Sequence, residues 1–325
     1  LHVRSRRQRQ MCIRDSVKFF YDICFLFSLI INSNMKKIIL LGCTLTFMIA
    51  CNSETKTEDT QKTTIEKTKS MNTERIVSLN GSVTETLALL GKGGNIVGVD
   101  ITSTFPQNIK EQAANLGHVS SISAESILAL KPTLVYATSK EMKPELQKQL
   151  EQAKVTVRLI DQPMAADETK KMIATIATDM HSSDYEKYLT EIDKKIQQVK
   201  PVDQKPKVLF IYARGAGNLM IAGQKTPIEN IIEMAGGINA VNNIEDYKPL
   251  TPEALINANP DYILLFDRGL QSLGGKEGVL KIEGVSATNA GKKMNIISMD
   301  GQLLSGFGPR LGEATLQLNQ LLQGK

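Results

Sequence analysis

Few side chains in this 325-residue chain have types and spacing suited to chemistry at a metal or a substrate. All four cysteines lie at or before Cys51, so the rest of the chain can form neither a disulfide nor a thiolate metal site. Beyond that point the histidines are His118 and His181, which are too few for a zinc site. Gly215-Ala-Gly217 follows a β-type run as in a dinucleotide fingerprint, but Met220 stands at the third glycine position. Since a phosphate loop and a nucleophile elbow are also missing from the sequence, we expect that the protein is not an enzyme.

Two glutamates occupy equivalent places in an internal repeat, and all the matching residues are displaced by 128 positions. The matching residues are Ser123, Glu125 and Pro132 in the first copy and Thr251, Glu253 and Pro260 in the second. Each copy has the pattern of an N-cap hydroxyl, a short helix with a carboxylate in its first turn, a proline stop and a buried strand. Such a carboxylate stabilises its helix by about 0.3–1 kcal/mol without any partner. The shared displacement also favours two similar lobes, each of which presents one glutamate as a docking point.

The chain contains the pattern of an export leader in residues 35–50. Met35-Lys36-Lys37 is a positive region, an apolar run of about 13 residues follows, and a small residue precedes Cys51. The pattern resembles a bacterial lipoprotein signal peptide with its lipobox, which implies cleavage before Cys51 and lipidation of its sulfur. A buried helix or a membrane span is the alternative, but the run is shorter than the ~20 residues that cross a bilayer.

The segments on either side of the leader are interpreted differently. Residues 1–34 begin with Leu1 and are rich in arginine, so we interpret them as an upstream or non-native extension, with a second membrane segment as the alternative. Residues 51–73 are rich in Thr, Lys, Glu and Ser, which predicts a disordered tether.

The charge of the main body does not predict a nucleic-acid partner. Eight of the 39 Lys and Arg residues lie in residues 1–37, which leaves 31 against 32 Asp and Glu in residues 38–325. A near-neutral body lacks the basic footprint of a nucleic-acid-binding protein.

Alternating strand and helix patterns predict two α/β lobes with mainly parallel sheets. Between the lobes, apolar residues at spacings of three and four predict one long amphipathic helix. The predicted boundaries are 74–165 for the first lobe, 166–205 for the linker helical region and 206–325 for the second lobe. The predicted strands cover residues 75–79, 95–99, 133–136 and 155–160 in the first lobe, and 207–212, 262–266 and 295–299 in the second.

Two such lobes joined by one long helix are similar to the helix-linked class of bacterial substrate-binding proteins, which serve importers of vitamin B12, ferric siderophores and haem. The resemblance covers about residues 74–323. It implies Rossmann-like lobes with a ligand cleft between them.

Four stretches narrow the resemblance to the haem-binding proteins of bacterial haemin import systems. They are residues 75–85, Leu116-Gly-His118 with the residues up to Glu125, Arg214-Gly-Ala-Gly217 with Met220-Ile-Ala-Gly223, and Gly306-Phe-Gly-Pro-Arg310. The implied function is capture of haem as a transported ligand. The alternatives are a siderophore- or corrinoid-binding protein of the same class, and a haem-scavenging surface lipoprotein that works without a permease.

The resemblance also implies roles for individual residues. The position after Leu116-Gly117 carries an iron ligand in that family, so His118 is the expected axial ligand of haem iron. Arginine forks suit the two haem propionates. The second axial or face contact is expected among Met220, Tyr136 and Tyr212, and the propionate or rim contacts are expected to be Arg214 and Arg310. The remaining two expectations come from the residues themselves: Glu85 should cap its helix, and His181 should be exposed.

The partners follow from the same resemblance. Relatives dock on a membrane permease through one acidic residue per lobe, which implies this role for Glu125 and Glu253 and an ABC transporter permease with a cytoplasmic ATPase as the partner. The lipid on Cys51 would hold the protein at a membrane on the extracytoplasmic side.

Overall fold

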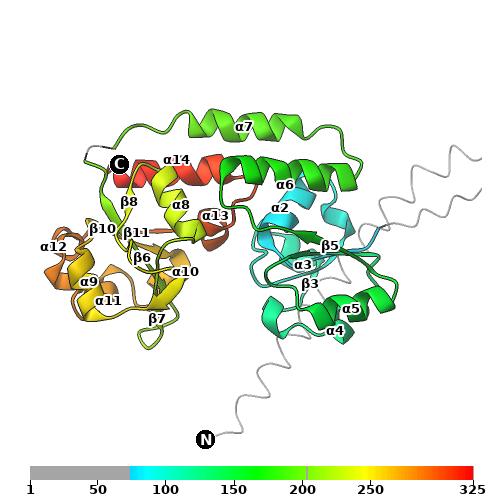
Figure 1. Cartoon of the computed structure of the whole chain (residues 1–325), viewed down its shortest axis with the longest axis horizontal. Coiled ribbons are helices and arrows are strands. Elements are labelled where there is room, and N and C mark those ends of the chain that lie inside the picture. The colour runs from blue at the N-terminus through cyan, green and yellow to red at the C-terminus, as the bar shows by residue number, and fades with distance from the viewer. Residues whose placement is uncertain (1–73, 203, 325) are drawn as a thin grey trace, which may run out of the picture. The chain divides into compact units, whose positions relative to one another are not determined.

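The computed structural model describes residues 74–202 and 204–324, which form two α/β lobes (Figure 1). The predicted leader, Cys51 and the tether lie outside the described residues. The described residues lie within one compact unit, and the hydrophobic clusters found among them give this part of the chain cores of its own. Among the described residues, no helix is both long enough and apolar enough to cross a membrane.

The N-terminal lobe is built on a five-stranded parallel sheet with the strand order β3-β2-β1-β4-β5. Both faces of this sheet are covered by helices, which explains why its central strands consist of continuous apolar residues. The strands are β1 (Ile76–Ser78), β2 (Ile96–Val99), β3 (Ala114–Asn115), β4 (Leu134–Thr138) and β5 (Thr156–Ile160), and the helices are α2 (Gly81–Leu89), α3 (Ile109–Gln112), α4 (Ala124–Leu128) and α5 (Pro144–Gln152).

The C-terminal lobe has a six-stranded mixed sheet. Strands β11, β10 and β6 run parallel, whereas β7 pairs antiparallel with β6 and with β9, and β8 pairs parallel with β6. The strands are β6 (Lys207–Ala213), β7 (Leu219–Ala222), β8 (Ile238–Asn239), β9 (Tyr247–Pro249), β10 (Tyr262–Phe266) and β11 (Ile296–Met299). The helices are α8 (Pro227–Met234), α9 (Pro252–Ala258), α10 (Asp267–Ser272), α11 (Lys276–Leu280), α12 (Asn289–Lys293), α13 (Gly301–Ser305) and α14 (Leu311–Leu322).

The segment between the lobes is a pair of helices, α6 (Ala166–Asp179) and α7 (Glu186–Ile196), rather than the single long helix that we expected. The chain turns at His181, whose φ of +50° is left-handed, within the polar run His181-Ser-Ser-Asp. Because α6 and α7 are separated by this turn, α7 packs against both α6 and α14 (Figure 1).

These two helices belong to both lobes. Next to the start of α6, Asn230 Nδ2 of the C-terminal lobe donates to the Met164 carbonyl at 3.0 Å. Further along, Met172, Ile173 and Ile176 of α6 are buried in the core of the N-terminal lobe. The start of α6 therefore contacts the C-terminal lobe, and the rest of α6 completes the core of the N-terminal lobe. The chain then returns to the C-terminal lobe through α7, which packs on α14.

Candidate functional site

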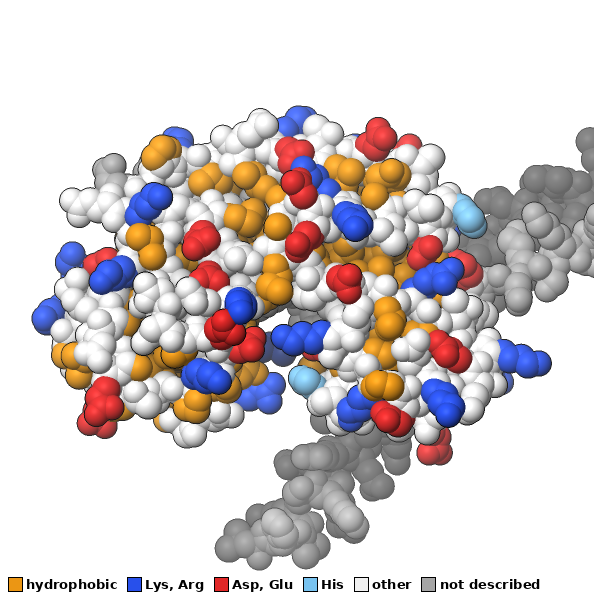
Figure 2. Space-filling model, in the orientation of Figure 1, with side chains coloured by type: hydrophobic (Ala, Val, Ile, Leu, Met, Phe, Trp, Pro, Cys, Tyr) orange, Lys and Arg blue, Asp and Glu red, His pale blue; other side chains and the backbone are white. Residues whose placement is uncertain are grey.

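The loops that follow the parallel strands of the two lobes meet each other. Gln302, which follows β11, accepts a hydrogen bond from the backbone N–H of Thr104, in the loop after β2, at 2.7 Å. The carboxyl ends of both sheets therefore point toward the interlobe region, which is where α/β proteins bind ligands. The space-filling view shows a hollow between the two lobes (Figure 2).

His118 lies in the loop after β3, with its side chain exposed. Its ring Nδ1 is 2.8 Å from the Ser120 hydroxyl oxygen and 3.3 Å from the Ser120 backbone nitrogen, so Ser120 holds the ring orientation. The Ser120 backbone N–H donates to Nδ1, so Nδ1 is engaged by Ser120 and Nε2 is the ring nitrogen left to face a metal. The Gly117 carbonyl accepts from the backbone N–H of Ile101 at 2.9 Å, which brings an exposed apolar side chain next to the histidine.

Metal binding at His118 requires a metal that brings other ligands of its own. Among residues 74–202 and 204–324, no group of three or more His, Cys, Asp or Glu side chains is arranged to hold an ion. A porphyrin supplies four equatorial nitrogens and needs only axial ligands from the protein. The exposed imidazole of His118 could supply one such axial ligand.

Tyr212 and Met220 are neighbours on one face of the C-terminal sheet, because they are register partners in the antiparallel pair β6 and β7. Both side chains are half-buried. The Tyr212 ring packs edge-on against Phe266, with 6.0 Å between the ring centroids. A phenol and a thioether thus lie together at the carboxyl end of β6.

Arg214 follows β6 and interacts with the same tyrosine. Its Nε donates to the Tyr212 hydroxyl oxygen at 2.6 Å, and its guanidinium carbon is 5.4 Å from the centre of the Tyr212 ring. The Arg214 side chain is exposed and makes no other hydrogen bond with the described residues. Its remaining nitrogens can therefore donate to an anionic ligand.

Tyr136 does not have the position that we expected for a ligand contact. Its side chain is 0% exposed within the core of the N-terminal lobe, and its hydroxyl donates to Asp179 Oδ2 at 3.0 Å. Burial, together with the nearby Asp179 charge, raises the pKa of Tyr136. Tyr136 is a core residue, because it lies on β4, an inner strand between β1 and β5 whose residues are all buried.

Arg310 also has a partner other than the one that we expected. Its guanidinium pairs with Glu85 of the other lobe at 2.9 Å. Glu85 was expected to cap α2, but the cap is Asn80, whose side chain accepts from the backbone N–H groups of Ser82 and Val83. Arg310 and Glu85 line a cavity of about 400 Å³ that contains neither His118 nor Tyr212.

Glu125 and Glu253 lie in the first turns of α4 and α9, and both side chains are exposed. The predicted caps are confirmed, because Ser123 and Thr251 accept from backbone N–H groups three residues ahead, each at 3.2 Å. Neither glutamate has an ion-pair partner among the described residues. His181 is exposed, as expected.

Sequence analysis missed two residues near His118, namely Ser120 and Ile101. Ser120 is two positions from the histidine, so the spacing that allows a side-chain contact was visible in the sequence. Ile101 becomes a neighbour only because β2 and β3 are adjacent in the sheet, and a two-residue strand such as β3 gives almost no sequence signal.

A model of the periplasmic binding protein family matches residues 76–303 of this chain. The periplasmic heme-binding protein RhuT from Roseiflexus sp. RS-1, in apo form, is 36% identical with a TM-score of 0.72, and the match covers 78% of this chain and 98% of RhuT. The periplasmic heme-binding protein BhuT in complex with two hemes is 32% identical with a TM-score of 0.72, covering 77% of this chain and 98% of BhuT. The uncharacterized ABC transporter substrate-binding lipoprotein YvrC of Bacillus subtilis is 28% identical, covering 75% of this chain and 78% of YvrC.

Proposed function

Because the chain belongs to the periplasmic binding protein family, we propose that it is the extracytoplasmic substrate-binding component of an ABC transporter, and that its ligand is haem. The observation that carries the proposal is the position of His118 at the carboxyl-end edge of one lobe, with the Tyr212 and Arg214 pair at the corresponding edge of the other. The likeness to RhuT and BhuT supports the choice of haem.

In this proposal His118 Nε2 binds the iron. Ser120, whose backbone N–H donates to Nδ1 and whose hydroxyl oxygen is 2.8 Å from it, holds the ring in the orientation that leaves Nε2 for the iron. Tyr212 is the second contact, because the hydrogen bond from Arg214 holds its hydroxyl oxygen in place at the carboxyl end of β6. Met220, which lies beside Tyr212, packs on the porphyrin face. Arg214 donates its remaining nitrogens to a propionate.

Optical titration of residues 52–325 with ferric haem tests this assignment. We expect a Soret shift in the unaltered protein and at least about tenfold weaker binding with an altered spectrum in His118→Ala. His181→Ala is the matched control, because it removes the other exposed histidine of the body. The haem assignment fails if the unaltered protein gives no Soret shift, and titration with a ferric siderophore or a corrinoid then identifies the class of ligand.

The iron-ligand role of His118 is a separate claim with its own outcome. An identical Soret shift and affinity in His118→Ala would exclude it while leaving haem as the ligand. Ser120→Ala should give an intermediate loss of affinity, because the ring keeps its nitrogen but loses the hydroxyl that helps to hold its orientation.

Delivery to a permease is proposed through Glu125 and Glu253. Both carboxylates are exposed without an ion-pair partner among the described residues, so arginines on a permease can reach them. Reversing both to lysine should abolish transport into vesicles that contain the permease and ATPase while haem binding stays intact. Glu145→Lys is the matched control, because Glu145 is exposed in the first turn of α5. Unchanged transport in the double variant, with haem binding intact, would overturn the docking proposal.

Membrane attachment is proposed through Cys51, on the strength of the leader pattern and the likeness to YvrC. Cys51→Ser should move the protein from the membrane fraction to the soluble fraction. Equal membrane retention of the variant would disprove the lipid anchor.

A further inference from the structure

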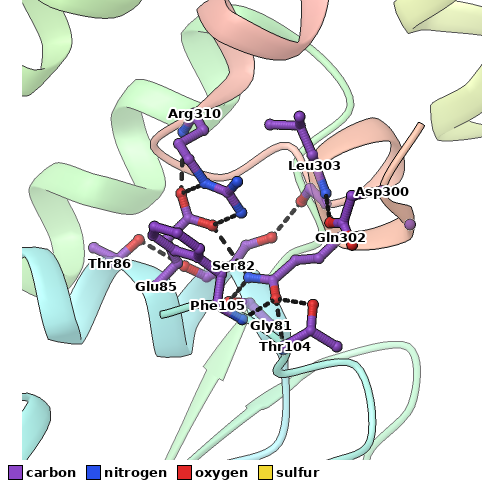
Figure 3. A network of polar contacts seen from close by, with 12 residues as sticks. Gly81, Ser82, Glu85, Thr86, Thr104, Phe105, Asp300, Gln302, Leu303 and Arg310 are labelled. Atoms are coloured by element: carbon purple, nitrogen blue, oxygen red, sulfur yellow. Dashed lines mark hydrogen bonds and ion pairs between the residues drawn. The ribbon is translucent and has the colours of Figure 1, made fainter. Parts of the chain in front are cut away.

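A polar network joins the two lobes at the start of α2 (Figure 3). Arg310 of the C-terminal lobe donates from Nε to Glu85 Oε1 at 3.0 Å and from Nη2 to Glu85 Oε2 at 2.9 Å. The backbone N–H of Arg310 donates to the same Oε1 at 3.2 Å. A bidentate, charge-assisted contact of this kind fixes direction as well as distance.

This ion pair is sheltered from water. The Glu85 side chain is 5% exposed and the Arg310 side chain 21% exposed. The guanidinium carbon also lies 3.7 Å from the centre of the Phe105 ring. Burial raises the pKa of Glu85, and the hydrogen bonds and charge of Arg310 act in the opposite direction. Because separation of the lobes would leave each buried charge without its partner, the pair resists opening.

Gln302 makes a second set of contacts across the same junction. Its Oε1 accepts from the backbone N–H groups of Thr104 at 2.7 Å and Phe105 at 2.8 Å, and from the Thr104 hydroxyl at 2.9 Å. Its Nε2 donates to the Gly81 carbonyl at 2.8 Å and to Glu85 Oε2 at 3.1 Å. One side chain from the C-terminal lobe thus connects α2 and the loop after β2.

The segment Gly306-Phe-Gly-Pro-Arg310 adds backbone contacts. The Gly306 carbonyl accepts from the Ser82 hydroxyl and, at 3.1 Å, from Gln162 Nε2. The Phe307 carbonyl accepts from the Thr169 hydroxyl at 3.0 Å. At Gly308 a Cβ atom would lie 3.3 Å from the Ser82 Cβ, so a glycine allows the backbone to lie directly on α2.

We propose that Gly306–Arg310 and Gln302, with Ser82 and Glu85 on α2, form an interlobe lock that fixes the separation of the lobes and thereby the width of the ligand cleft. Arg310 is a positioning residue in this lock rather than a propionate contact. Its fork is occupied by a carboxylate of the protein, and it contacts Phe105 instead of the region around His118. The lock does not depend on the identity of the ligand, because it is formed by contacts between groups of the protein itself.

Measurement of the distance between the lobes tests the lock directly and needs no ligand. Residues 52–325 contain no cysteine, so Lys148→Cys on α5 and Lys281→Cys after α11, both exposed, can carry spin labels. We expect one narrow distance distribution in the labelled parent and a broader or longer one after Arg310→Met, which keeps an unbranched side chain against Phe105 but removes the ion pair. An unchanged distribution would overturn the proposal.

A second arm follows haem dissociation and rests on the proposed function. Arg310→Met should raise the dissociation rate about tenfold with the Soret position unchanged, and Arg310→Lys should restore part of the loss because it keeps one charged donor. Faster dissociation without any change in the distance distribution would assign Arg310 to the ligand and refute the lock. If Arg310→Met does not fold, Ser82→Ala, which removes only the hydroxyl bond to Gly306, serves the same comparison.

Lys195→Met is the matched control for both arms. Lys195 of α7 pairs with Glu313 of α14 at 3.9 Å, with 33% and 45% of the two side chains exposed. A loose and exposed pair contributes little. If Lys195→Met broadened the distance distribution as much as Arg310→Met does, the broadening would not depend on the Arg310–Glu85 pair. That result would refute the lock.

Discussion

Replacement of Gln302 by methionine removes the five hydrogen bonds that the Gln302 side chain makes across the lobe junction, while nearly preserving side-chain length. The backbone N–H groups of Thr104 and Phe105 and the Gly81 carbonyl then lose their partner. A buried polar group left without a partner costs about 1–3 kcal/mol. Gly81 is buried, whereas Gln302 and Thr104 are half-buried and Phe105 is 37% exposed, so water replaces part of the loss. We therefore expect the free energy of unfolding to fall by about 2–4 kcal/mol.

Urea unfolding of residues 52–325, followed by circular dichroism, measures this loss. Gln147→Met on α5 is the control, because the Gln147 side chain donates only to Glu151 on its own helix, and we expect a change below about 0.5 kcal/mol. Amide exchange should also accelerate at residues 104 and 105 in Gln302→Met. A loss that does not exceed the control, with unchanged exchange at these two amides, would refute the reasoning.

Three further predictions concern the lobes themselves. Tyr136→Phe removes a buried hydroxyl that donates to Asp179, so thermal unfolding should show a loss of about 1–2 kcal/mol with the haem spectrum unchanged; an altered spectrum would contradict its assignment to the core. At Gly278 an added Cβ would lie 1.6 Å from the Leu273 carbonyl oxygen, so Gly278→Ala should cost about 3 kcal/mol or more, whereas equal stability would contradict this close approach. Burial raises the pKa of Tyr247 to about 12, above the unfolded value of about 10. Because the folded state holds the Tyr247 proton more tightly than the unfolded state, the protonated hydroxyl stabilises the fold below about pH 10, and this stabilisation is lost as the pH rises toward 12. The difference in unfolding free energy between the unaltered protein and Tyr247→Phe should therefore change over this pH range. A difference that does not depend on pH would contradict the raised pKa.

The sequence predicts the parallel strands of three or more residues well, because each is a short apolar, β-branched run with clear limits. The predicted strand at residues 262–266 coincides with β10, and the one at 207–212 differs from β6 by one residue. The antiparallel strands β7 and β9 and the two-residue parallel strands β3 and β8 were missed. Leu219–Ala222 is a four-residue run that gains its strand character from pairing with β6 and β9.

The helix limits of the repeat were also predictable, because Ser123 and Thr251 act through backbone groups three residues away. The break between α6 and α7 was visible as the polar run at His181, because the apolar spacing of three and four that favoured one helix begins only at Tyr185. The partner of Arg310 could not be inferred, because Glu85 is 225 positions away and a guanidinium fork suits a propionate as well as a glutamate. Gln302 carries no sequence signal of its own, since an amide has no preferred partner until the fold supplies one.

The path of α6 has a consequence for the order in which the protein can fold. The core of the N-terminal lobe includes Met172, Ile173 and Ile176 from α6 and Ile192 from α7. A chain that emerges N-terminus first therefore cannot bury this core until residues beyond 192 are available. A fragment that ends at residue 165 would expose the apolar surface that these helices cover. During synthesis the N-terminal lobe therefore stays partly unfolded, and accessible to proteases and chaperones, until α6 and α7 have been made.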